Sequence, residues 1–298
     1  MIGFEQKMSK RTLRMAVGCL SLCIGALSTA AFAVAAQVPA ADSRDLASRP
    51  LLAYADLADL VTSAPMVVVV QVKKASKVDP ERTGPVRAGW VRTYVEADTK
   101  ALLSGRAAIG GKVKYLADVK LDPDGRMPKL KKQTMVVFAR PVAGQPAELQ
   151  LVAPDAQVAI GLIGEARLRS LLAELAALDA APQVTGVRDA YHTPGNLAGE
   201  GETQIFLKTA KGESASITVL RSPSEPVRWG LSTGELVNPD AAPPAPDSLA
   251  WYRLACTLPA QLPASAQIAS DSALRQAAAR DYALVMRQLG PCGRQRVY

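Results

Sequence analysis

The sequence predicts an α+β protein in which a small antiparallel β-barrel precedes a second domain of helices and strands. The barrel is predicted from five closely spaced segments between residues 66 and 152 that alternate apolar and polar side chains or consist of β-branched residues. The second domain is predicted from a leucine-rich amphipathic segment at 165–178 and two helical segments near the C-terminus. The chain has 298 residues, of which 49% are hydrophobic, as in globular rather than disordered proteins.

The first 36 residues have the pattern of a signal peptide. Four Lys and Arg residues come before an apolar run from Met15 to about Ala31, and small residues follow it. This pattern predicts cleavage before Val34 or Gln37 and a periplasmic or secreted mature protein. An uncleaved membrane anchor is the alternative, because residues 15–36 form a stretch of 22 residues that is long enough to cross a bilayer.

The mature chain keeps two of the four cysteines, Cys256 and Cys292. An even pair in an oxidising compartment usually forms a disulfide, so we expect these two residues to be joined. A redox pair is the alternative, but the C-x-x-C spacing typical of such pairs is missing. His192 is the only histidine, which excludes zinc sites that need several imidazoles, and we expect neither a metal nor another cofactor.

The length of the mature chain predicts two domains, at residues 37–160 and 161–298. Their charges differ. Residues 66–141 carry 16 Lys and Arg against 7 Asp and Glu, whereas residues 155–298 carry 13 against 14. The first domain is therefore basic and the second is close to neutral.

A short helix is predicted to lead into the barrel, beginning after Ser48-Arg49-Pro50 and ending at Ala64-Pro65. The valine-rich segment 66–72 is too short for a typical helix and predicts a buried strand. A loop rich in Gly, Pro and charged residues follows at 79–89.

Four more strands are predicted from alternation and from β-branched content, at residues 90–103, 112–121, 134–140 and 148–152. Short turns connect them, as expected for a barrel of few strands. Three lysines lie before the 134–140 strand, and we interpret them as charges that discourage aggregation through a strand edge: Lys129, Lys131 and Lys132.

The region from residue 50 to 160 resembles the OB-type or netrin-like barrels of exported proteins. The resemblance rests on the helix ending in Ala64-Pro65, the valine-rich strand, the long aromatic strand from Trp90 and the further strands. The whole chain is also similar to uncharacterised exported bacterial proteins, and this similarity implies location rather than activity.

The second domain is predicted to contain a helix at 165–178, a hairpin within 204–220 and a short strand at 227–231. A proline-rich connector at 238–246 separates these elements from the end of the chain. Two C-terminal helices are predicted, and the residues expected to cap them are Asp247 for the first and Ser270 or Asp271 for the second, which runs to Leu289.

The candidate binding residues lie on the polar face of the 90–103 and 112–121 strands. If these strands pair, Trp90, Arg92 and Tyr94 share a surface with two lysines, Lys112 and Lys114. OB-type barrels bind oligonucleotides or oligosaccharides on such a face. For an exported protein we expect an envelope polysaccharide, an anionic lipid or a protein partner rather than genomic nucleic acid. Ordinary cross-strand pairing is the alternative interpretation, and the sequence assigns no oligomeric state.

The sequence favours a non-catalytic binding or structural protein of the cell envelope. The alternative is a secreted serine hydrolase, because residues 230–234 match the G-x-S-x-G motif with Ser232 as nucleophile. In that class a helix follows the serine and the histidine comes later in the chain. Here prolines follow, and His192 comes earlier.

Overall fold

The computed structural model describes residues 51–234 and 241–296 of the chain. The predicted signal peptide, residues 1–36, lies outside these ranges, and so does the expected start of the leading helix at Ser48. Within the described ranges, no helix combines the length and apolarity needed to cross a membrane.

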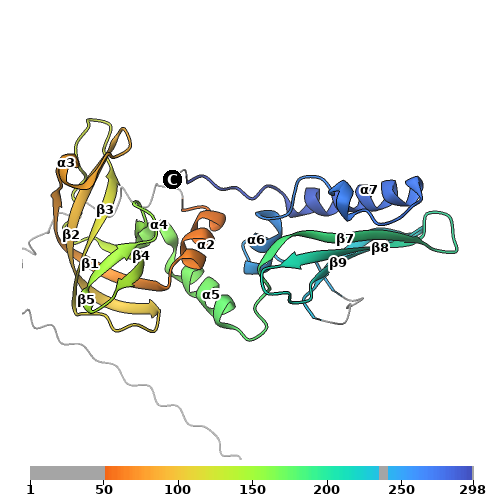
Figure 1. The fold of residues 1–298 in the computed structure, drawn as a ribbon, viewed down its shortest axis with the longest axis horizontal. Coiled ribbons are helices and arrows are strands. Elements are labelled where there is room, and N and C mark those ends of the chain that lie inside the picture. Colours follow the sequence, from red (N-terminus) through yellow and green to blue (C-terminus); the bar gives the residue numbers. More distant parts are fainter. Residues whose placement is uncertain (1–50, 235–240, 297–298) are drawn as a thin grey trace, which may run out of the picture. The chain divides into compact units, whose positions relative to one another are not determined.

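Five strands form a closed barrel (Figure 1). Their order around the barrel is β1-β2-β3-β5-β4, and β4 pairs with β1 to complete the ring. All neighbouring strands are antiparallel except β3 and β5, which run parallel, so the predicted barrel is corrected from wholly antiparallel to mixed at one seam. The strands are β1 (Met66–Lys77), β2 (Trp90–Ser104), β3 (Lys112–Lys120), β4 (Thr134–Val142) and β5 (Gln145–Leu151).

The valine run in β1 is explained by burial on both of its faces. Val68, Val70 and Val72 point into the barrel interior, whereas Val67 joins a second hydrophobic cluster outside it. Strand β3 has only one buried face, so buried side chains alternate with exposed ones, apart from Asp118, which is half-buried. Because of this difference in burial, the sequence of β1 is a continuous apolar run, whereas the sequence of β3 alternates between apolar and polar residues.

The leading helix is shorter than the sequence indicates. Helix α2 spans Tyr54–Ser63, and its N-cap, Ala53, makes no side-chain capping hydrogen bond. Just before the helix, the N–H of Leu52 donates to the carbonyl of Leu162 at 2.7 Å, which holds this residue outside the helix. Three short elements complete this half of the chain: α3 (Pro80–Thr83), β6 (Gln157–Ala159) and α4 (Ile160–Ile163).

The second half contains a four-stranded antiparallel sheet in the order β10-β9-β8-β7. Its strands are β7 (Val184–Pro194), β8 (Gly201–Thr209), β9 (Ser216–Ser222) and β10 (Glu225–Ser232). The long helix α7 (Ser272–Leu289) packs along β7 and β8 (Figure 1). The other helical elements here are α5 (Glu165–Ala176), α6 (Leu249–Ala255) and η1 (Ala264–Ala266). The structure is thus of the mixed α+β class, as predicted.

In this half, the predicted cap of α6 and the predicted end of α5 are wrong, and the structure decides between the two candidate caps of α7. Helix α6 is capped by Ser248, whose hydroxyl accepts from the N–H of Trp251, rather than by Asp247. Of the two candidate caps for α7, Asp271 accepts from the N–H of Ala273 at 2.6 Å. Helix α5 ends at Ala176, two residues before the predicted end.

The predicted disulfide is confirmed. Cys256 and Cys292 are joined with an S–S distance of 2.11 Å and lie 4.7 Å apart at Cα. Cys256 is the C-cap of α6, and Cys292 follows Gly290, the C-cap of α7. The bond therefore links the ends of the two C-terminal helices.

Candidate binding groove on the barrel

A groove with a volume of about 610 Å³ lies where β3 and β5 meet in the barrel. The two strands pair there through a single residue pair, Lys114 and Glu148. Side chains from β2, β3, β4 and β5 line the groove. Three of the five predicted binding residues are among them, namely Arg92, Tyr94 and Lys114.

Arg92 is held in place by an ion pair. Its Nε and Nη2 atoms donate to the two carboxylate oxygens of Asp118 at 2.7 and 3.0 Å, and Nη1 donates to the carbonyl of Thr83 at 2.6 Å. The hydrogen bonds to Asp118 outweigh the effect of burial and raise the pKa of the guanidinium above its ordinary value. Because its donors are already engaged, Arg92 shapes the groove rather than offering a free charge.

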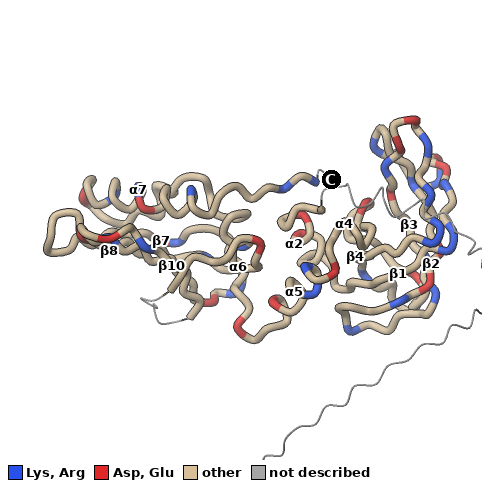
Figure 2. The backbone as a smooth tube through the Cα atoms, turned by 180° about the vertical axis from the view of Figure 1, so that it is seen from behind, with Lys and Arg blue, Asp and Glu red and all other residues tan. Residues whose placement is uncertain are grey.

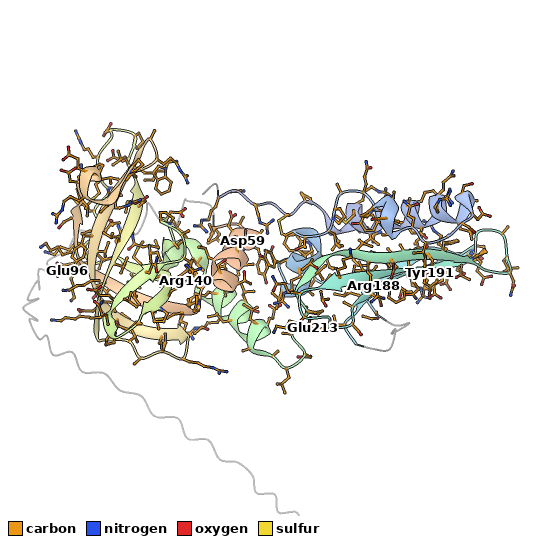
Figure 3. All side chains as sticks on the ribbon, in the orientation of Figure 1. Asp59, Glu96, Arg140, Arg188, Tyr191 and Glu213 are labelled. Atoms are coloured by element: carbon orange, nitrogen blue, oxygen red, sulfur yellow. A yellow bond between two sulfur atoms is a disulfide. The ribbon has the colours of Figure 1, made fainter. Side chains whose placement is uncertain are left out.

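Lys114 and Arg140 are the two cations of the groove that remain available. Both are exposed, and within the described residues neither has a carboxylate oxygen within ion-pair distance. Arg140 lies near the end of β4 (Figure 3). In the strand register it is opposite Gln150 of β5. The sequence pointed to Lys114 but missed Arg140, because nothing in the sequence indicates that the end of β4 meets β5 beside β3.

Two apolar side chains beside these cations are exposed to solvent. Tyr94 on β2 and Leu116 on β3 are cross-strand partners, with relative exposures of 37% and 43%. Large exposed apolar side chains next to uncommitted cations are typical of a surface that contacts a ligand with both charged and apolar parts.

The other two predicted residues, Trp90 and Lys112, lie on the outer face of the same strands but outside the groove. The ring of Trp90 lies under the guanidinium of Arg87, with Cζ 5.1 Å from the ring centroid. Lys112 is opposite Asp98 in the strand register. Acidic residues share this face, as the alternation of the two strands also predicts: Glu96, Asp98 and Asp118.

Ser232, the candidate nucleophile of the hydrolase alternative, is the last residue of β10. It is opposite Ser216 in the register and only 5% exposed. The segment after Ser232, which would have to form a helix, enters residues 235–240, and these lie outside the described ranges.

His192 belongs to a polar network between the sheet and α7. Its Nδ1 atom lies 2.8 Å from the hydroxyl of Thr203, which itself donates to Asp281, and Arg221 donates to the same carboxylate at 2.6 Å. Thr203 and Asp281 are 0% and 1% exposed, so this network joins secondary-structure elements in the interior.

Comparisons with known proteins add no family to this description. No protein-family model matches the chain, and no curated protein matches it. Neither resemblance inferred from the sequence therefore gains support from relatives. Among the described residues, no group of three or more His, Cys, Asp and Glu side chains is placed to hold a metal ion.

Proposed function

We propose that the protein is an exported, non-catalytic binding protein of the cell envelope, periplasmic or secreted, whose barrel groove binds an acidic polysaccharide. The observation that carries the proposal is the position of Lys114 and Arg140, two uncommitted cations, beside exposed Tyr94 and Leu116 in one groove. Cations attract carboxylate or phosphate groups, and the aromatic and aliphatic side chains pack on the apolar faces of sugar rings.

The charges around the groove favour a polysaccharide over a nucleic acid. Asp118 and Glu148 line the groove with the cations, and Glu96 is opposite Lys114 on β2. Asp118 is neutralised by Arg92 and Glu96 lies 3.8 Å from Lys74, but Glu148 forms no ion pair among the described residues. Glu148 would repel a ligand with a phosphate at every unit, whereas a glycan with more widely spaced charges can place them on Lys114 and Arg140.

The strand order also supports a binding role. A closed five-stranded barrel with this order is compatible with an OB-like barrel, a class that binds ligands on the face of its second and third strands. Arg92, Tyr94 and Lys114 come from β2 and β3. Export is proposed from the basic and apolar pattern of residues 1–36.

The proposal can be tested by measuring binding of residues 37–298 to a panel of acidic and neutral polysaccharides, anionic vesicles and single-stranded DNA. Each ligand should be measured at about 0.05 M and about 0.5 M salt, because screening weakens contacts between exposed charges. We expect salt-sensitive binding to the acidic polysaccharides and much weaker binding to neutral ones. Equal binding to neutral and acidic polysaccharides, or no polysaccharide binding at all, would contradict the proposal.

A further inference from the structure

Two loops lie together at one end of the barrel. They connect β1 to β2 (residues 78–89) and β3 to β4 (residues 121–133). The N–H of Leu121 donates to the carbonyl of Gly89 at 2.9 Å, which joins the loops directly. Residues far apart in the sequence therefore form one surface.

This surface, which we call the basic end, carries eight exposed cations from the two loops and the strand residues next to them. Figure 2 marks the Lys and Arg positions of the barrel in blue along the backbone. Four acidic residues come from the same segments. Three of the lysines precede β4, which is paired on both sides in the closed barrel, so protection of a free strand edge does not account for them. The eight cations are Lys77, Arg82, Arg87, Lys120, Arg126, Lys129, Lys131 and Lys132.

Most of the acidic residues here are engaged in local structure. Asp79 caps α3 by accepting from the N–H of Glu81 at 3.0 Å. Asp122 accepts from the N–H of Arg126 at 2.7 Å, and Asp124 lies 3.9 Å from the guanidinium of the same arginine. Arg126 is thus the only one of the eight cations with an ion pair among the described residues. The others keep their charge available to a partner.

The loops are anchored rather than loosely attached. Leu130 is only 6% exposed and packs with the barrel interior, and the N–H of Lys132 donates to the carbonyl of Val72 at 2.8 Å. Trp90 lies at the same end, half-buried, beneath the guanidinium of Arg87. Anchoring reduces the entropy lost when the cations bind a partner.

We propose that the basic end docks the protein onto an anionic lipid bilayer. The eight cations come from two loops at a barrel end, and none of them lines the groove between β3 and β5. A cluster of charges outside a groove matches a planar array of headgroups better than a single polymer strand, which follows a channel. Each Lys or Arg close to an anionic leaflet adds attraction, and tryptophan is favoured at the level of the headgroups. This surface is separate from the groove and does not depend on what the groove binds.

The test is flotation of residues 37–298 with vesicles of phosphatidylcholine, with and without phosphatidylglycerol. The test variant is R82E/K129E/K131E, which reverses exposed charges in both loops and leaves Lys132 alone because its backbone is left-handed, at φ 71°. The matched control is K208E/K211E/R280E, which makes the same change in net charge at exposed positions of the second half. Thermal unfolding of each variant checks that it is folded.

We expect the protein to float with phosphatidylglycerol vesicles, to lose this binding at about 0.5 M salt, and to bind at least about tenfold more weakly in the test variant. The control should bind as the unmodified protein does. Three results would overturn the proposal: no flotation with anionic vesicles, equal flotation with pure phosphatidylcholine, or equal losses in the test variant and the control. A variant of the groove, K114E/R140E, should bind vesicles normally, which separates this proposal from that for the groove.

Discussion

The guanidinium of Arg92 and the carboxylate of Asp118 form a two-point ion pair across β2 and β3, with N–O distances of 2.7 and 3.0 Å. Only 18% and 10% of the two side chains are exposed. A pair of this kind, shielded from water, fixes the geometry of the groove wall. Lys114, on the same face, is exposed and free of such a partner among the described residues. The two cations should therefore differ in what they contribute.

Replacing Arg92 with alanine should destabilise the fold, because it leaves the carboxylate of Asp118 without its main partner. We expect the free energy of unfolding to fall by about 2 kcal/mol in R92A and by less than about 0.5 kcal/mol in K114A. Urea titration of both variants measures the difference. Equal stabilities would show that the ion pair has no structural role.

Asp59 on α2 gives the stability of the protein a dependence on acid. Burial alone would raise the pKa of Asp59, but hydrogen bonds from Arg294 and Tyr252 outweigh it and hold that pKa below its ordinary value. The carboxylate therefore stabilises the fold above the pKa of the unfolded chain, and this contribution is lost as the pH falls through the lower folded pKa. We expect the free energy of unfolding to decrease between about pH 5 and about pH 2.

The variant D59N should lose part of this acid dependence, because the amide does not titrate. Exposed Asp179 offers the matched control, and D179N should keep the pH profile of the unmodified protein. Urea midpoints measured across the pH range test both variants. An unchanged slope in D59N would show that Asp59 is not a source of the dependence.

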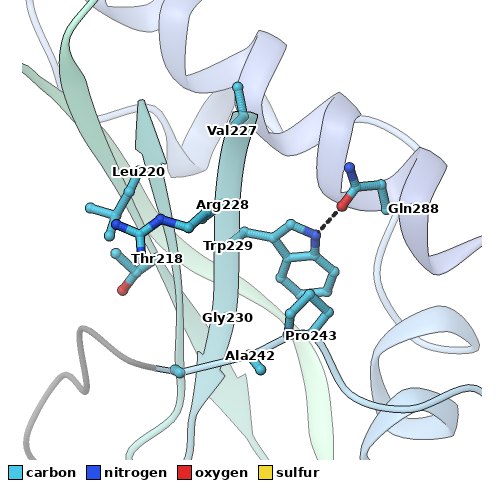
Figure 4. Close-up of a pocket in the computed structure, with 10 residues that line it drawn as sticks. Thr218, Leu220, Val227, Arg228, Trp229, Gly230, Ala242, Pro243 and Gln288 are labelled. Carbon is cyan, nitrogen blue, oxygen red and sulfur yellow. Dashed lines mark hydrogen bonds between the residues drawn. The ribbon is translucent and has the colours of Figure 1, made fainter. Parts of the chain in front are cut away.

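Gly230 is required where the proline-rich connector crosses β10. A Cβ atom at this position would clash with the backbone carbonyl of Ala241, and the N–H of Leu231 donates to the carbonyl of Ala242 at 3.3 Å. Figure 4 shows Gly230 on β10 beside Ala242 and Pro243 of the connector. We expect G230A to lower the free energy of unfolding by about 1–3 kcal/mol through this overlap. At Gly234 no atom of the described residues lies within 4 Å of the added carbon, so G234A should have little effect when thermal unfolding of the two variants is compared.

The bond between Cys256 and Cys292 closes a loop with a sequence separation of 36. A crosslink of this kind reduces the conformational entropy of the unfolded chain, and we expect C256S/C292S to lose about 2–4 kcal/mol. Chemical unfolding of the variant and of the unmodified protein gives the difference. A loss below about 0.5 kcal/mol would indicate that the helix ends are held by other contacts.

The barrel strands could be predicted from the sequence because each carries a clear pattern. Alternation marks β3, and burial on two faces produces the valine run of β1. Strand β7 was missed because register shifts after Val184 and Val187 interrupt its alternation. The parallel seam between β3 and β5 depends on how the last hairpin closes the ring, and no local pattern records that.

The candidate site was predictable only in part for a related reason. Alternation placed Arg92, Tyr94 and Lys114 on one face, and they do line one groove. Alternation could not show that Asp118 forms an ion pair with Arg92, because this contact depends on the strand register. Arg140 was missed because the β4–β5 hairpin reaches the groove through the pairing of β5 with β3, and these two strands are distant in sequence.

The most direct test of the binding account is the affinity of residues 37–298 for polygalacturonate, a polymer of uronic acid, compared between the unmodified protein and K114E/R140E. The control K208E/R280E makes the same change in net charge away from the groove. We predict salt-sensitive binding that weakens at least about tenfold in K114E/R140E and stays unchanged in the control. If K114E/R140E bound as tightly as the control while both remained folded, the groove would not be the binding site.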